Sequence, residues 1–381
     1  MKKPNNRRSF LGKLGLGLGS LMAIPLFSVS RDKTNDKMKE NAPTNPLLES
    51  KEMGFQWETS DPFLFCVHHE DHFPKGNGKM GPAPEYLNGR SLGDDFIIKD
   101  GFRMYHGKQI PGFPGHPHRG FETVTVVREG LVDHADSLGA AGRYGHGDVQ
   151  WMTAGQGVQH SEMFPLLHDD KDNPMELFQI WLNLPARNKM VKPHFKMLWD
   201  DTIPRYNHTD SKGLKTRIEI IAGEIEGQKA PTPPPDSWAA DTHNHVAIWV
   251  IKMDAGAEWT LPPAMPGVNR TLYFYGGEQL IVAGNFIKPY HTAKLQADQA
   301  VLMQNPGGQA RILMLQGRPI QEPVIQYGPF VMNTKDEIHK AFDDFHKTGF
   351  GGWPWPDPAQ VHAKSLGRFA RHADGKEEFR S

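Results

Sequence analysis

The stretch Gly112-Phe-Pro-Gly-His116-Pro-His118-Arg-Gly-Phe-Glu122 runs into the segment Phe121-Glu-Thr-Val-Thr-Val-Val127. Because that segment is rich in valine and threonine, it predicts a β-strand. Residues two apart on an extended chain point to the same side, so His116 and His118 can present both imidazoles to one metal ion. Pro117 lies between them and biases His116 away from helical backbone. The stretch therefore predicts a strand that carries half of a metal site.

A second pair of ligand-type residues lies in Gly155-Gln-Gly157-Val-Gln-His160-Ser-Glu162-Met163. His160 and Glu162 are again two apart and share a face of a predicted strand. Two strands of one barrel would then supply three nitrogens and one carboxylate. That set suits Fe, Mn, Ni, Co or Cu with open positions better than a closed structural zinc site. Glu122 is the alternative carboxylate; the alternation along its strand favours Glu162 as the ligand and a structural role for Glu122.

Short apolar runs separated by glycine, proline, asparagine and aspartate continue along the chain. Strands of this kind, closely spaced and with little helix between them, predict an all-β sandwich or barrel architecture. The runs fall into two halves, which we assign to residues 53–190 and 214–325. Phe121 and Trp151 in the first half could stack on a flat aromatic ligand, or they could belong to the core of the barrel.

A helical segment is predicted over residues 326–350. Asn333-Thr334 can cap a helix at Lys335–Lys347, whose apolar residues share one face at helical spacing. The remaining residues, 351–381, contain Trp and Pro and then become charged. We expect a tail that packs at its tryptophans and frays beyond them.

Residues 1–30 predict a signal peptide, because basic residues precede a short apolar, glycine-interrupted stretch that ends in small residues. Within it, Asn6-Arg7-Arg8-Ser9-Phe10-Leu11-Gly12-Lys13 resembles the twin-arginine export signal. The alternative is the basic region of a general export signal. Residues 31–52 are polar and aperiodic, which predicts a linker. We therefore expect an exported, periplasmic protein without stable membrane insertion after the signal is removed.

Charge and cysteine content exclude some classes of partner and of metal site. The chain has 43 Lys and Arg against 44 Asp and Glu, so no field of one sign attracts nucleic acid or a membrane surface. Its single cysteine, Cys66, excludes an intramolecular disulfide and a cysteine-rich zinc site. A metal site must therefore be sought among the histidines. Of the others in the first half, we expect His106, His134 and His146 at turns or on the surface; the alternative is that one of them lines the site.

The sequence resembles the pirins, two-barrel members of the cupin superfamily. The resemblance spans residues 61–346, and beyond the two histidine stretches it is carried by Asp61-Pro-Phe-Leu64, Gly147-Asp-Val-Gln-Trp-Met-Thr-Ala-Gly155, Trp181-Leu-Asn-Leu-Pro185, Lys288-Pro-Tyr-His-Thr-Ala293 and Glu322-Pro-Val-Ile-Gln-Tyr-Gly-Pro-Phe-Val-Met-Asn-Thr334. It implies two cupin (jelly-roll-like) β-barrels in tandem, followed by a short helical segment. It also implies an iron site made by His116, His118, His160 and Glu162 in the first barrel, and a second barrel without metal.

The resemblance implies a function as well. Pirins resemble quercetinases in site layout, so we expect a dioxygenase that opens flavonols such as quercetin with O2. One divalent transition metal, Fe, with Ni, Mn, Co or Cu as alternatives, would activate the small aromatic substrate. Glu162 would hold the metal and act catalytically by accepting the substrate proton. The alternatives are an iron-dependent redox sensor that binds an unknown protein partner, and a metal-storing protein, both without catalysis.

This chain departs from a typical pirin in three respects. It carries the export signal, an extra loop around residues 71–90, and a proline-rich insertion near residues 228–237. The extra loop and the insertion could change which substrate enters the site. Because of the export signal, roles of animal pirins in the nucleus are not transferred to this chain.

Overall fold

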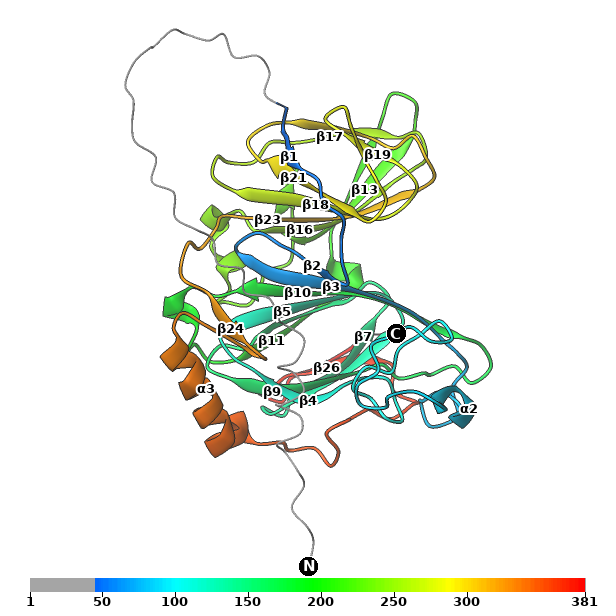
Figure 1. Cartoon of the computed structure of the whole chain (residues 1–381), viewed down its shortest axis with the longest axis vertical. Coiled ribbons are helices and arrows are strands. Elements are labelled where there is room, and N and C mark those ends of the chain that lie inside the picture. The colour runs from blue at the N-terminus through cyan, green and yellow to red at the C-terminus, as the bar shows by residue number, and fades with distance from the viewer. Residues whose placement is uncertain (1–44, 381) are drawn as a thin grey trace, which may run out of the picture.

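The computed structural model describes residues 45–380, so the predicted signal peptide and the first part of the predicted linker lie outside the described residues. Two β-barrels are stacked on one another, and one longer helix lies beside the first barrel (Figure 1). The all-β, two-barrel fold expected from the sequence is confirmed. Within the described range, no helix combines the length and the apolar character needed to cross a membrane.

The first barrel consists of two six-stranded antiparallel sheets. Their strand orders are β11-β8-β5-β10-β3-β2 and β27-β26-β7-β6-β9-β4. The strands are β2 (Gln56–Trp57), β3 (Phe63–Phe73), β4 (Gly112–His118), β5 (Phe121–Glu129), β6 (Leu131–Asp136), β7 (Ala141–Gly145), β8 (Val149–Thr153), β9 (Val158–Met163), β10 (Asn173–Asn183), β11 (His194–Leu198), β26 (Arg368–Arg371) and β27 (Glu377–Arg380).

The second barrel combines a seven-stranded sheet, β1-β21-β18-β23-β16-β13-β12, with a four-stranded sheet, β17-β22-β19-β20. Two hairpins, β14-β15 and β24-β25, lie outside these sheets. The strands are β1 (Leu47–Glu49), β12 (Arg205–Thr209), β13 (Lys215–Ala222), β14 (Glu224–Ile225), β15 (Gln228–Lys229), β16 (Ala247–Met253), β17 (Glu258–Leu261), β18 (Asn269–Gly276), β19 (Leu280–Val282), β20 (Asn285–Ile287), β21 (His291–Gln296), β22 (Val301–Gln304), β23 (Ala310–Gly317), β24 (Ile325–Tyr327) and β25 (Phe330–Met332).

The helices are short except for one. The predicted helix at Lys335–Lys347 is observed as α3 (Lys335–Thr348), and Thr334 and Glu337 form a capping box at its start. Its buried residues Ile338 and Ala341 pack on Phe330 and its neighbours. The others are α2 (Pro84–Leu87) and the 3-10 turns Ala186–Asn188, Asp200–Thr202, Trp238–Ala240, Thr242–Asn244 and Gly349–Gly351.

Alternation along β5 shows how the barrels are joined. Val124 and Val126 point outward into the apolar core between the barrels, where Trp151 is also fully buried. Thr123 and Thr125 point to the opposite side, because side chains alternate across a strand. Thr125 hydrogen-bonds Glu162 of the facing sheet, so this opposite side is the barrel interior. Trp151 is therefore a core residue, as in the second of the two alternatives given above, and does not stack on a ligand.

The ends of the described chain differ from the prediction. Residues 47–49 of the predicted linker form β1, which pairs with β21 of the second barrel, because Leu47 packs on the core of that barrel. The predicted fraying of the tail is also wrong: β26 pairs with β7 and extends the first barrel, burying Phe369 and Ala370. The first barrel likewise continues past residue 190 into β11, whose Phe195 lies in its core.

Candidate metal centre

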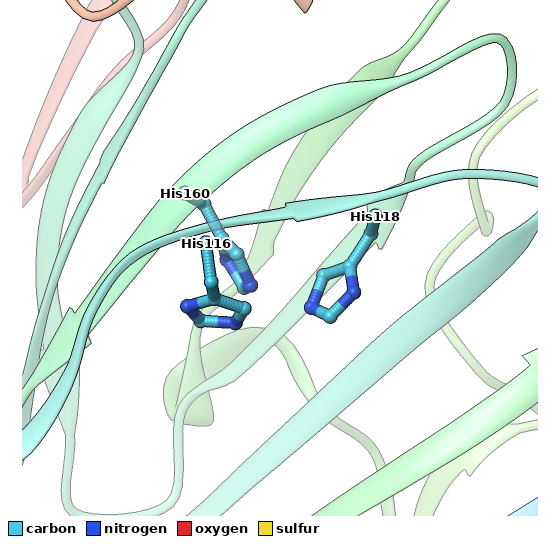
Figure 2. A group of neighbouring side chains, drawn as sticks. All are labelled: His116, His118 and His160. Carbon is cyan, nitrogen blue, oxygen red and sulfur yellow. The ribbon is translucent and has the colours of Figure 1, made fainter. Parts of the chain in front are cut away.

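Three of the four predicted ligands converge inside the first barrel. His116 and His118 lie on β4, His160 lies on β9, and the antiparallel register places His116 opposite His160. One nitrogen from each imidazole lies within 4.8 Å of the other two. Figure 2 shows the three rings gathered between the two strands. Such a cluster of imidazoles is typical of a transition-metal site.

Backbone carbonyls orient two of these rings. His116 Nδ1 lies 3.0 Å from the Pro114 carbonyl oxygen, and His118 Nδ1 lies 3.4 Å from that of Pro329. A carbonyl can only accept, so both Nδ1 atoms carry the proton and both Nε2 atoms keep a free lone pair. A carbonyl that holds the far side of the ring is the usual support of a metal-binding histidine.

His160 fits a metal site for a different reason. Both of its ring nitrogens are buried, and neither has a hydrogen-bond partner among the described residues. An unpartnered buried nitrogen is costly, and a metal ion would satisfy one of them. Burial also lowers the pKa of all three histidines, that of His116 to about 4. The imidazoles are thus neutral at pH 7, which is the form that binds a metal.

Glu162 lies beside the triad but outside the group of three. Its Oε2 is 3.9 Å from His160 Nε2 and accepts a hydrogen bond of 3.1 Å from Gln179. Its Oε1 accepts one of 2.9 Å from Thr125. Burial raises the pKa of the carboxyl group, while these hydrogen bonds and His134 oppose the rise. The structure thus places a carboxylate at the site, and its role as the fourth ligand remains a prediction.

Glu122, the alternative carboxylate, points away from the triad toward the second barrel. It accepts hydrogen bonds from Thr153 Oγ1 at 2.6 Å and from Ser237 Oγ at 2.5 Å. Burial raises its pKa to about 7. Since Ser237 belongs to the predicted proline-rich insertion, Glu122 connects that insertion to the first barrel, in keeping with the structural role that we favoured.

His134 is not at a turn or on the surface, as the sequence suggested. It is fully buried on β6, and its ring centroid is 5.5 Å from that of His160. Its Nε2 lies 3.3 Å from Asp136 Oδ2, and its Nδ1 has no partner among the described residues. Its place near the triad comes from the pairing of β6 with β9, which sets His134 opposite Glu162. His146 is exposed at a turn, as expected.

Aromatic side chains border the triad on two sides. Trp181 lies 5.3 Å from His118 and 4.3 Å from Phe65, measured between ring centroids. Phe113 lies 6.3 Å from the ring of His116 on the other side. Phe65, Phe113 and His116 are partly exposed, so solvent reaches this edge of the barrel. Phe121 is fully buried behind Trp181, with the two rings stacked at 3.9 Å.

The C-terminal segment braces both ligand strands from outside. The Gly115 amide, next to His116, donates to the Pro358 carbonyl at 2.8 Å. The Gln159 side chain, next to His160, donates to the Gly352 carbonyl at 3.1 Å.

Glycine is required where β4 begins, since Gly112 has φ +128° and a Cβ there would lie 2.5 Å from the Glu162 carbonyl oxygen.

Comparison with known proteins agrees with this geometry. Residues 50–182 match the Pirin family and residues 248–351 match the Pirin C-terminal cupin domain. Human pirin is 36% identical over 264 residues, covering 68% of this chain and 83% of that protein. A Pseudomonas aeruginosa protein provisionally named a quercetin 2,3-dioxygenase is 36% identical over 243 residues, covering 64% of this chain and 80% of its own length.

A solved structure is similar across both barrels. It is the crystal structure of a quercetin 2,3-dioxygenase from Acinetobacter baumannii, with 28% identity and a TM-score of 0.61. The match covers 80% of this chain and 98% of that one. The matches in sequence and structure extend over both barrels and include the strands that carry the histidines. The chain therefore belongs to the pirin family, as a protein of two cupin domains in tandem.

Proposed function

We propose that this chain is an exported mononuclear metal enzyme that opens flavonols such as quercetin with O2. The observation that carries the proposal is the set of three neutral imidazoles that converge beside Glu162, at a partly exposed edge lined by aromatic rings. The names of the Pseudomonas and Acinetobacter relatives supply the reaction class. Iron is the metal that we propose. Nickel, manganese, cobalt and copper are alternatives, because three imidazoles and a carboxylate do not discriminate among these metals.

A metal held by His116, His118 and His160 would supply Lewis acidity, which lowers the pKa of a hydroxyl group bound to it. Glu162 Oε2 would accept the proton that this hydroxyl group releases, since a carboxylate in this position can act as a general base. Gln179 donates to the same oxygen and holds it in place. In the overall reaction, the flavonol and O2 give a depside and one molecule of CO.

The aromatic residues would orient the substrate. Phe65 and Trp181 lie against each other beside His118, and Phe113 lies beside His116. A flat aromatic substrate placed between these two positions would contact rings at both ends. Rings that are fixed by packing would also keep the reacting carbon near the metal.

The test is oxygen consumption and CO release with quercetin, using protein loaded separately with each of the five metals. We expect oxygen-dependent loss of the quercetin absorbance and one CO per substrate with at least one metal. The His116→Ala/His160→Ala double variant is the control and should be inactive. No CO with any metal, together with partner binding that depends on the redox state of iron, would favour the sensor function instead.

The proposed export is tested separately. A double substitution, Arg7→Lys/Arg8→Lys, should retain the protein in the cytoplasm if the twin-arginine route is used. Cell fractionation of the two forms measures this. A variant that still reaches the periplasm would indicate a general export signal.

A further inference from the structure

A chain of hydrogen bonds that the metal centre does not use lies at the same edge of the barrel. His69 Nδ1 is 2.8 Å from the Tyr105 hydroxyl oxygen, and that hydroxyl lies 2.5 Å from Asp71 Oδ2. Arg103 Nη1 lies 2.9 Å from the same hydroxyl oxygen, and the Arg103 amide donates to Asp71 Oδ1 at 2.8 Å. All four residues are buried. A buried polar network of this kind fixes the orientation of each of its members.

The donors and acceptors in this network determine which nitrogen of His69 carries a proton. A tyrosine hydroxyl has one proton, which Tyr105 donates to Asp71. Arg103 can only donate, so the Tyr105 oxygen accepts from it. The same oxygen must therefore accept from His69 Nδ1 as well. His69 is then protonated at Nδ1, and its Nε2 presents a lone pair. Burial, with the charge of Arg103, lowers the pKa of His69 to about 3 and keeps the ring neutral.

The side chain of His69 lies on the face of β3 that is turned toward the interior of the first barrel. His68 packs on Trp57 and Tyr275 in the core between the barrels, so the next residue on β3 points into the first barrel. The ring of His69 lies 5.9 Å from that of Phe113, which neighbours His116. His69 is 5% exposed, and its Nε2 has no partner among the described residues. Because this unpartnered atom is not completely sealed from solvent, a small group can reach it.

His69 lies at one end of a row of inward-facing residues that we call the rim: Phe65, Val67 and His69 of β3, with Phe113 and His116 of β4. Phe65 is adjacent to His118 through Trp181, and His69 is adjacent to His116 through Phe113. Residues 65 and 69 are about 13 Å apart along an extended strand. That length accommodates a ligand of two or three rings, one end of which lies at the triad.

We propose that His69 Nε2 accepts a hydrogen bond from a hydroxyl group on the end of the flat aromatic ligand that is remote from the metal. His69 would thus be a specificity-determining residue, selecting polyphenols with a hydroxyl group at that end. Tyr105, oriented by Asp71 and Arg103, is a positioning residue that keeps the lone pair of His69 directed at the ligand. The inference rests on the proposed function, since it takes the substrate to be a flavonol.

The expected selectivity follows from the cost of an unsatisfied acceptor. A ligand that lacks the hydroxyl group would exclude water from His69 Nε2 without replacing its hydrogen bond. Sites built to bind a hydroxyl group reject analogues without it more strongly than apolar pockets reject small differences in size. We therefore expect discrimination of at least about tenfold between the two ligands.

The experiment compares two flavonols, quercetin and the analogue without hydroxyl groups on the pendant ring, by calorimetric titration of the metal-loaded protein. The wild type should bind quercetin at least about tenfold more tightly. In His69→Phe this ratio should fall to near one, and in Tyr105→Phe it should fall partway, because the His69 proton loses its acceptor. His72→Phe is the matched control, since His72 is exposed on the same strand, and it should keep the wild-type ratio.

The outcomes separate this inference from the proposed function. If the wild type releases CO and His69→Phe keeps the full binding ratio, the role of His69 is wrong and the enzyme proposal stands. If no CO is released but the ratio falls to near one in His69→Phe and partway in Tyr105→Phe, His69 selects the ligand and the dioxygenase proposal fails. A wild type that binds the two flavonols equally would overturn the inference. Should His69→Phe fail to fold, the milder Tyr105→Phe provides the same comparison, and KM should rise while kcat is maintained.

Discussion

The two barrels share an architecture but differ in the side chains that their strands direct into the barrel interior. The first barrel directs polar groups inside, such as Thr125, Gln179 and Glu162, in addition to the histidines. The second barrel fills the equivalent space with apolar residues, such as Trp249, Ile251 and Met314. The fold by itself therefore specifies no chemistry. Which residue types occupy the inward half of each alternating strand decides whether a barrel is a site or a support.

The difference also has an energetic side. Several buried polar atoms in the first barrel lack hydrogen-bond partners among the described residues, including Thr123 Oγ1 and both polar atoms of Gln150. Each such group lowers stability unless a ligand or water satisfies it. A large apolar core in the second barrel and another between the barrels offset this cost. The first barrel can thus keep an interior suited to binding.

The strongest test of the comparison is metal content. The His116→Ala/His160→Ala double variant should lose its metal almost completely, because two of three converging nitrogens are removed. The matched substitution in the second barrel, His291→Ala, should have no effect, since His291 Nδ1 lies 2.9 Å from the Pro289 carbonyl oxygen and the residue is in no cluster of potential metal ligands among residues 45–380. Elemental analysis of the purified proteins measures both. A double variant that retains full metal would show that the site lies elsewhere.

The next effect is on rate and separates the two carboxylates of the first barrel. Glu162→Gln should lower kcat by about 10²-fold or more, because it removes the proton acceptor beside the triad. Glu122→Gln should leave kcat close to wild type, because Glu122 faces Ser237 and the second barrel. Steady-state kinetics with quercetin, at equal metal content, provide the measurement. Equal losses in the two variants would contradict the assignment of Glu162.

A smaller effect concerns stability, and exchanging Val and Thr between the barrels sharpens the comparison. Val301→Thr places an unpartnered hydroxyl group in the apolar second barrel and should cost about 1–3 kcal/mol. Thr123→Val removes a buried hydroxyl group from the first barrel and should be neutral or stabilising. Both residues are fully buried, so the substitutions are matched. Urea denaturation measures the two free energies of unfolding, and a larger cost for Thr123→Val would contradict this account.

A last effect concerns the pH dependence of the stability of the metal-free protein. The pKa of His116 is about 4 in the folded chain against 6.5 for an ordinary histidine, so the unfolded chain binds this proton first. The free energy of unfolding should therefore fall as the pH is lowered from about 6.5 to about 4. In His116→Phe, the slope over this range should be smaller by about one proton. Chemical denaturation at a series of pH values tests this, and an unchanged slope would show that folding does not lower the pKa of His116.

The sequence predicted the fold class and the position of α3 because both depend on local patterns: alternation, turn residues, and the capping box at Thr334. It also selected His116, His118 and His160, because strand spacing alone places each pair on one face. It did not find His134 or Trp181. Their proximity to the triad comes from pairings between distant strands, such as β6 with β9, which local patterns do not encode.

The misplaced ends have the same cause. The strands within residues 47–49 and 368–380 are only three or four residues long, so each forms only because a distant edge is available to pair with. Local periodicity could therefore predict the two ligand pairs, His116 with His118 and His160 with Glu162, and no other part of the site. The rim and the network around His69 depend on how β3 approaches β4, which follows from the whole barrel.

The crossed ends of the described chain constrain the order in which the protein can be made. β1 belongs to the second barrel, whereas β26 and β27 complete the sheet of the first barrel that carries both ligand strands. During synthesis, that sheet lacks two strands until residues 368–380 have left the ribosome. Pairing between such distant segments is slow compared with local folding. The sheet that carries His116, His118 and His160 thus reaches its final form only after the second barrel has been translated.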